Sequence, residues 1–120
     1  MAGLTPPFPE AFPTEAVTAL IGILRNGDIQ AKKRDAFHAA WIVAGWAGGM
    51  FVTNSVDPIG SIPIQTADGD LILGLCGEIE RAYPTQLCEA YGRVLSSDSV
   101  DITVLLRLLM MLIAILRGQT

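Results

Sequence analysis

The sequence predicts a mainly α-helical protein of four to five helices in a small bundle, with a proline-rich N-terminal arm and a central loop or short β-hairpin. Several stretches repeat apolar residues at helical spacing, and Pro and Gly cluster between these stretches. The 120 residues fit one domain. Hydrophobic residues make up 51% and charged residues 17%, which is more apolar than a solitary domain of this size usually is. We therefore expect other molecules to cover part of the surface.

Residues 1–13 are predicted to form an extended arm. Four prolines preclude a long helix there and space out Phe8 and Phe12. The segment has no basic stretch followed by a continuous apolar run, so no secretory signal is visible. We expect synthesis in the cytoplasm, and incorporation into a particle or a membrane complex is left open.

Residues 14–99 are predicted to form a helical domain, whose first helix begins at Thr14 as a side-chain N-cap. Asn26 and Gly27 supply a left-handed stop, after which Asp28 caps a second helix. The two helices should therefore meet at a tight corner. The apolar positions of the first helix follow helical spacing: Val17, Leu20, Ile21 and Leu24.

The second predicted helix changes character midway, from a basic start at residues 32–34 to an uncharged stretch at residues 36–52. Small residues on it allow another helix backbone to approach closely, in a tight soluble bundle or in a membrane dimer. Trp41 and Trp46 are interpreted as large anchors in the core or in an interface. The small residues are Ala36, Ala40, Ala44 and Gly48, spaced every fourth position, and the adjacent pair Gly45 and Gly49.

Residues 50–67 are predicted to be irregular, because Pro58, Gly60 and Pro63 forbid a long helix. A loop or a small hairpin fits these residues. Asp68, Gly69 and Asp70 resemble part of a calcium loop, but the following apolar residues lack the oxygen ligands that calcium needs.

A third helix is predicted from Thr66 or Asp68 to near Tyr83, and a short fourth helix is predicted after Pro84. The third helix carries an apolar stripe opposite its charged residues. The stripe consists of Leu71, Ile72, Leu75, Ile79 and Ala82.

Residues 100–120 are predicted to form a hydrophobic C-terminal helix used for assembly. From Ile102 to Leu116 every residue is apolar except Thr103 and Arg107. At about 1.5 Å per residue this stretch reaches roughly 22 Å, short of the ~30 Å hydrocarbon core of a bilayer. The helix therefore needs cover on nearly all sides, and we expect protein rather than lipid to provide it. Its narrow polar strip consists of Thr103, Arg107, Met110, Ala114 and Arg117.

No catalytic, cofactor-binding or metal-binding pattern emerges, and the sequence predicts that the protein is not an enzyme. His38 is the single histidine and lies in an apolar stretch, where a core or interface position is expected. Cys76 and Cys88 have neither CxxC spacing nor a nearby histidine, and they are interpreted as small core residues, with a disulfide as the alternative. The net charge of −4 argues against a nucleic-acid partner.

The leading hypothesis is a non-catalytic structural subunit of a larger assembly, for example a small virion protein. Its partners would be copies of itself or a large protein assembly. Two alternatives are a small membrane-associated helical hairpin, such as a holin-like protein or an accessory subunit, and a soluble module that binds one partner. The predicted interface residues are Phe8, Phe12, Ala40, Trp41, Ala44, Gly48, Leu105, Arg107, Leu109, Leu112, Ile113 and Leu116.

Overall fold

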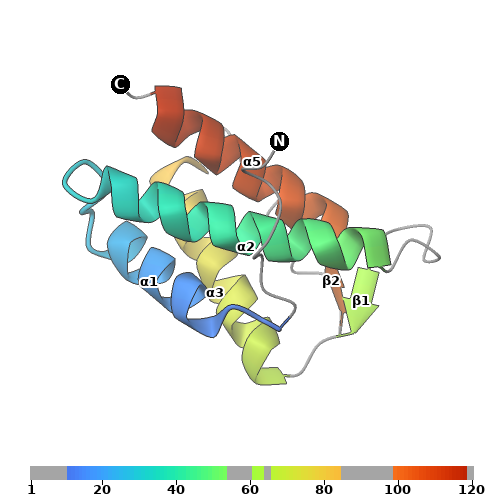
Figure 1. Cartoon of the computed structure of the whole chain (residues 1–120). Helices are drawn as coiled ribbons and strands as arrows, with labels where there is room; N and C mark the ends of the chain where they lie inside the picture. Colours follow the sequence, from blue (N-terminus) through green and yellow to red (C-terminus); the bar gives the residue numbers. More distant parts are fainter. Residues whose placement is uncertain (1–10, 54–60, 64–65, 85–98, 119–120) are drawn as a thin grey trace.

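The protein is mainly helical, as the sequence predicts (Figure 1). The computed structural model describes residues 11–53, 61–63, 66–84 and 99–118. The first ten residues of the predicted arm and the predicted helix after Pro84 lie outside this part. The described elements are α1 (Thr14–Arg25), α2 (Lys33–Thr53), β1 (Ser61–Pro63), α3 (Thr66–Ala82), β2 (Ser99–Asp101) and α5 (Ile102–Gly118).

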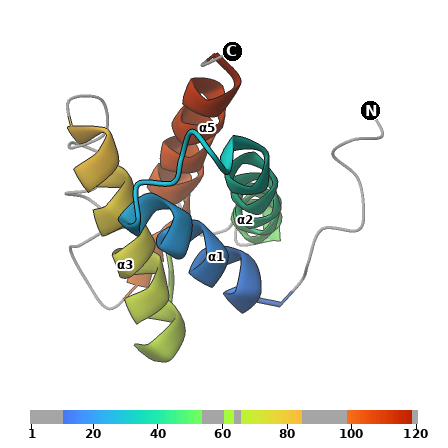
Figure 2. The ribbon, with the colours of Figure 1, turned by 90° about the vertical axis from the view of Figure 1, so that its left-hand side faces the viewer.

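The four described helices pack in the spatial order α5, α2, α1, α3. The most extensive contact joins α2 to α5, which run in opposite directions (Figures 1 and 2). In contrast, α1 and α3 run side by side in the same direction, and α3 touches α5 only slightly. The C-terminal ends of α1, α3 and α5 therefore gather at the same end of the bundle as the N-terminal end of α2.

The core combines a small-residue side of α2 with a leucine-rich side of α5. Alanines on a helix let another helix approach closely, and large side chains on the partner fill the remaining space. The buried alanines of α2 are Ala36, Ala39, Ala40, Ala44 and Ala47. The buried residues of α5 are Ile102, Val104, Leu105, Leu108, Leu109, Leu112, Ile113 and Leu116.

Helix α1 ends as the sequence predicts, because Gly27 adopts the left-handed conformation with a φ of 72°. The N–H of Gly27 donates to the carbonyl of Leu24 at 3.2 Å, and the N–H of Asp28 donates to the carbonyl of Ile23 at 3.1 Å. These two bonds form a Schellman motif, which pairs carbonyl groups that the helix itself leaves unpaired.

Two predicted caps are wrong. Thr14 is the first residue of α1, and Pro13 occupies the N-cap position without a side-chain hydrogen bond. Asp28 does not cap α2, because its carbonyl instead accepts from the N–H of Lys32 in a turn, and α2 begins only at Lys33. Once the Schellman motif has reversed the chain, this extra turn is needed before the second helix begins.

The central segment also differs from its prediction. The helices extend into the predicted irregular range 50–67, because α2 continues to Thr53 and α3 begins at Thr66. Strand β1 lies between them, but its partner is the distant strand β2 rather than a neighbour in a hairpin. The antiparallel register pairs Ile62 with Val100. Because β2 leads directly into α5, this pairing fixes where the last helix begins.

Adjacent residues on α5 give a direct test of the core. Replacing Leu109, which is fully buried, by alanine should lower the free energy of unfolding by about 2–5 kcal/mol, because the substitution removes buried methyl groups and leaves a cavity. Replacing the exposed neighbour Met110 by alanine should change it by less than about 0.5 kcal/mol. Urea denaturation of both variants measures the difference. Equal losses in the two variants would contradict the observed orientation of α5.

Candidate functional site

The structure places most of the predicted interface residues inside the bundle. Arg107 is exposed, and Phe12, Trp41 and Gly48 are half-buried, whereas Phe8 lies outside the described residues. The remaining predicted residues are covered by the chain itself, so α2 supplies the cover that α5 needs. The use of α5 in assembly stays a prediction, and it can rest only on the side of α5 that faces away from α2. The covered residues are Ala40, Ala44, Leu105, Leu109, Leu112, Ile113 and Leu116.

The outward side of α5 is the polar strip that the sequence predicts, with Thr103 half-buried and the other four residues exposed. Met110 is 47% exposed and lies on the same face as Arg107 and Ala114. The strip therefore combines an accessible apolar side chain with arginines.

A second accessible surface, the α2 outer face, lies opposite the buried alanines of α2. Its central position is occupied by His38, which is exposed, so of the two positions expected for His38 the core position is wrong and the interface position stays a prediction. Trp41 is half-buried, and its ring stacks on Phe37 with the centroids 5.9 Å apart. The α2 outer face consists of Arg34, His38, Trp41, Ile42, Gly45 and Gly49.

Two glycines of α2, Gly48 and Gly49, have no packing role within the described chain. A Cβ atom built at Gly48 or at Gly49 would meet no other atom within 4 Å. The predicted close helix approach therefore occurs at the alanines but not at these two glycines. On the neighbouring side of α2, Trp46 is buried and makes a T-shaped contact with Phe12, with the centroids 5.2 Å apart, so the residue two positions before α1 contacts this part of α2.

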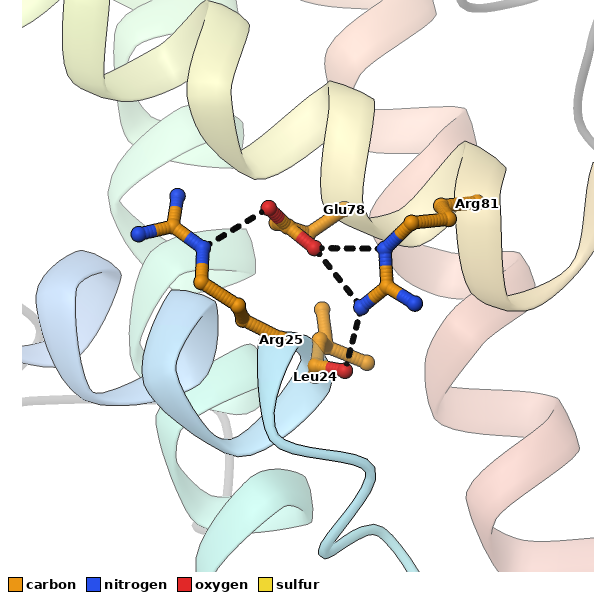
Figure 3. Close-up of polar contacts among 4 residues, drawn as sticks. All are labelled: Leu24, Arg25, Glu78 and Arg81. Atoms are coloured by element: carbon orange, nitrogen blue, oxygen red, sulfur yellow. Dashed lines mark hydrogen bonds and ion pairs between the residues drawn. The ribbon is translucent and has the colours of Figure 1, made fainter.

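One polar cluster joins α1 to α3 (Figure 3). Glu78 accepts from Nε of Arg25 at 2.9 Å and from Nε of Arg81 at 2.9 Å. Nη2 of Arg81 also donates to the carbonyl of Leu24 at 2.8 Å, which adds a side-chain cap to the C-terminal turn of α1. The hydrogen bond from Arg25, followed by that from Arg81, lowers the pKa of Glu78. The cluster fixes α1 against α3.

Sequence reasoning missed this cluster. The spacing of Glu78 and Arg81 signals a local ion pair, because residues three positions apart are neighbours on a helix. Nothing in the sequence indicates that Arg25, which is 53 positions away from Glu78, joins them. The cluster links structural elements, and its arginines are largely exposed.

The titratable groups do not converge on one chemical centre in the described part of the chain. Cys76 is buried as a free thiol, as the core interpretation predicts, and burial raises its pKa to about 12. Glu78 is engaged by arginines, and Oε1 of Glu80 is covered without a hydrogen-bond partner among the described residues. No group of three His, Cys, Asp or Glu residues in the described ranges could hold a metal ion. Cys88 lies outside these ranges.

Comparisons with known proteins add no relative. No family model matches the chain, and no curated protein or solved structure shows significant similarity to it. Among the described helices, none has both the length and the apolar character needed to cross a bilayer.

The lowered pKa of Glu78 predicts a pH-dependent contribution to stability. The unfolded chain takes up this proton at a higher pH than the folded chain, so the stabilisation is complete above the unfolded pKa and is lost as pH falls through the folded pKa. Glu78→Gln should therefore lower the free energy of unfolding by about 0.5–1 kcal/mol at about pH 7 and have little effect at about pH 2. Urea denaturation at both values tests this. Asp70→Asn, at an exposed carboxylate of the same helix, should show no such change.

The open surroundings of Gly49 predict a stabilising substitution. Gly49→Ala should raise the free energy of unfolding of the isolated chain by about 0.5–1 kcal/mol, because alanine favours the helix and its Cβ meets no other atom. Gly27→Ala should instead lower it by about 1–2 kcal/mol, because alanine disfavours a positive φ. Thermal unfolding of the two variants should give shifts of opposite sign. A destabilising Gly49→Ala would show that the glycine already packs within the chain.

Proposed function

We propose that this protein is a non-catalytic assembly subunit of a larger complex, such as a small virion protein, and that it packs against copies of itself or against a larger protein assembly. The observation that carries this proposal is the open surface beside Gly48 and Gly49. A glycine within a helix costs about 1 kcal/mol relative to alanine, and no contact within the described chain compensates for this cost. A helix of a partner that approaches closely would compensate for it.

Apolar side chains next to these glycines support the same conclusion. Trp41 and Ile42 lie half-buried on the α2 outer face, and large aromatic side chains contribute strongly to protein interfaces. The base of the arm lies close by, because Phe12 contacts Trp46. We infer that the arm and the α2 outer face form one interface, as the sequence-based hypothesis expects for the arm.

The outward strip of α5 supplies a second surface for the same role. Met110 offers apolar area, and Arg107 and Arg117 offer donors for carboxylates of a neighbouring subunit. The C-terminal helix then takes part in assembly through its exposed strip, while its buried side holds the subunit together.

The glycine surface gives the sharpest test of this function. Size exclusion with light scattering should show a discrete oligomer of the full chain that does not depend on mild detergent. Gly49→Leu should give a folded protein of lower oligomeric mass, because leucine favours a helix and fills the space that the partner needs. Ala19→Leu, which adds the same side chain at an exposed position of α1, should leave the oligomer unchanged.

Two outcomes would contradict the proposal, and each favours an alternative. A full chain that is recovered only in detergent would favour the membrane-associated hairpin. A stable monomer of the unmodified chain that forms a stoichiometric complex with one other protein would favour the soluble binding module.

A further inference from the structure

Basic side chains gather at one end of the bundle. The C-terminal ends of α1, α3 and α5 meet the N-terminal end of α2 there, on the left-hand side of Figure 1 and toward the viewer in Figure 2. This basic end also holds the acidic residues Asp28, Asp35, Glu78 and Glu80, so among the described residues of this end basic ones outnumber acidic ones by six to four. The basic residues are Arg25, Lys32, Lys33, Arg34, Arg81 and Arg117.

The opposite end of α1 and α3 is acidic. The contact of Ile21 with Gly74 and the ion pair of Arg25 with Glu78 show that the two helices run in parallel, so their first turns lie at the same end. These turns contain no Lys or Arg, and the last turn of α2 contains none either. The acidic end consists of Glu15 and Asp70, which are exposed, and Asp68, which is half-buried.

Helix dipoles explain only part of this distribution. Acidic residues in a first turn and basic residues in a last turn stabilise their own helix, which accounts for Glu15 and Asp68 and for Arg25, Arg81 and Arg117.

Residues 32–34 oppose the rule, because they place three positive charges at the positive end of the α2 dipole. Lys32 and Arg34 are exposed and form no ion pair with any described residue. Within the described residues, the charges of Lys32 and Arg34 are therefore not balanced by an ion pair, and they concentrate positive potential at the corner between α1 and α2.

We propose that the basic end of one copy docks on the acidic end of a second copy. The two surfaces have opposite charge and lie at opposite ends of the same chain, so the contact is head-to-tail. The whole chain carries a net charge of −4, so copies repel one another on average, and the opposite charges brought together in this arrangement offset that repulsion. Head-to-tail contacts repeat into a ring or an open chain of subunits. This inference deepens the proposed assembly role and rests on it.

Light scattering over a range of protein concentrations tests the proposal with two charge-reversal variants of the full chain. The first combines Lys32→Glu with Lys33→Glu, which leaves Arg34 of the α2 outer face unchanged, and these glutamates also suit the start of α2. The second combines Glu15→Lys with Asp70→Lys. At about 0.02 M salt, each variant alone should associate at least about tenfold more weakly than the unmodified chain. An equimolar mixture of the two should recover association, because one variant then has two acidic ends and the other has two basic ends.

Salt and a matched control separate this contact from the glycine surface. Raising salt to about 0.5 M shortens the screening length to roughly 4 Å and should weaken the head-to-tail contact. Thr18→Glu with Ala19→Glu adds charge to the middle of α1 and should leave association unchanged. Circular dichroism checks that every variant is folded, and the neutral pair Glu15→Gln with Asp70→Asn replaces the second variant if that variant unfolds.

Association that ignores salt and both charge reversals but is lost in Gly49→Leu would overturn the head-to-tail contact and leave the proposed assembly role in place. Two other outcomes would overturn the head-to-tail contact and contradict the assembly interface as well. In the first, neither the charge-reversal variants nor Gly49→Leu lose association. In the second, the unmodified chain stays monomeric while it binds vesicles containing phosphatidylserine.

Discussion

The packing of α5 on the alanine side of α2 is the contact on which the rest of this structure depends. Each leucine or isoleucine buried there contributes roughly 1.5–3 kcal/mol, and the alanines keep the two helices close enough for that burial. Helix α1 rests on α2, and α3 rests on α1, so the whole bundle is built outward from this one pair. The same contact determines which sides of α2 and α5 face outward, and hence which surfaces are available to a partner.

The polar cluster of Arg25, Glu78 and Arg81 has a different role. Exposed ion pairs contribute little free energy, and both arginines are more than half exposed. Their geometry nevertheless selects one register of α1 on α3, because Arg81 must reach both Glu78 and the carbonyl of Leu24. Packing supplies the stability of this helix pair, and the cluster supplies its alignment. The alignment in turn brings the acidic first turns of both helices to the same end.

Local signals predicted most of the fold and less of the surface. Gly27 predicts the end of α1, and the polar strip around Arg107 predicts which side of α5 faces outward. Both features depend on residues that are close together in the sequence. The pairing of Ile62 with Val100 and the reach of Arg25 to Glu78 depend on the tertiary arrangement, so no local pattern predicts them. The sequence does not indicate which helix buries the apolar surface of α5, because burial by α2 and burial by another copy require the same apolar residues. Among the predicted interface residues, Trp41 and Gly48 are half-buried, whereas most of the others are buried within the bundle.

The long separation between α2 and α5 also affects how the chain is made. At about 5–20 residues per second, a ribosome needs roughly 2–10 s to add the residues between Thr53 and Ile102. During that interval the alanine side of α2 exists without α5, the helix that packs most extensively against α2. The nascent chain must therefore be protected by the ribosome surface or a chaperone, or else α1 must shield α2 while the later residues are added. The core of this protein therefore cannot be completed until α5, the last helix, has been synthesised.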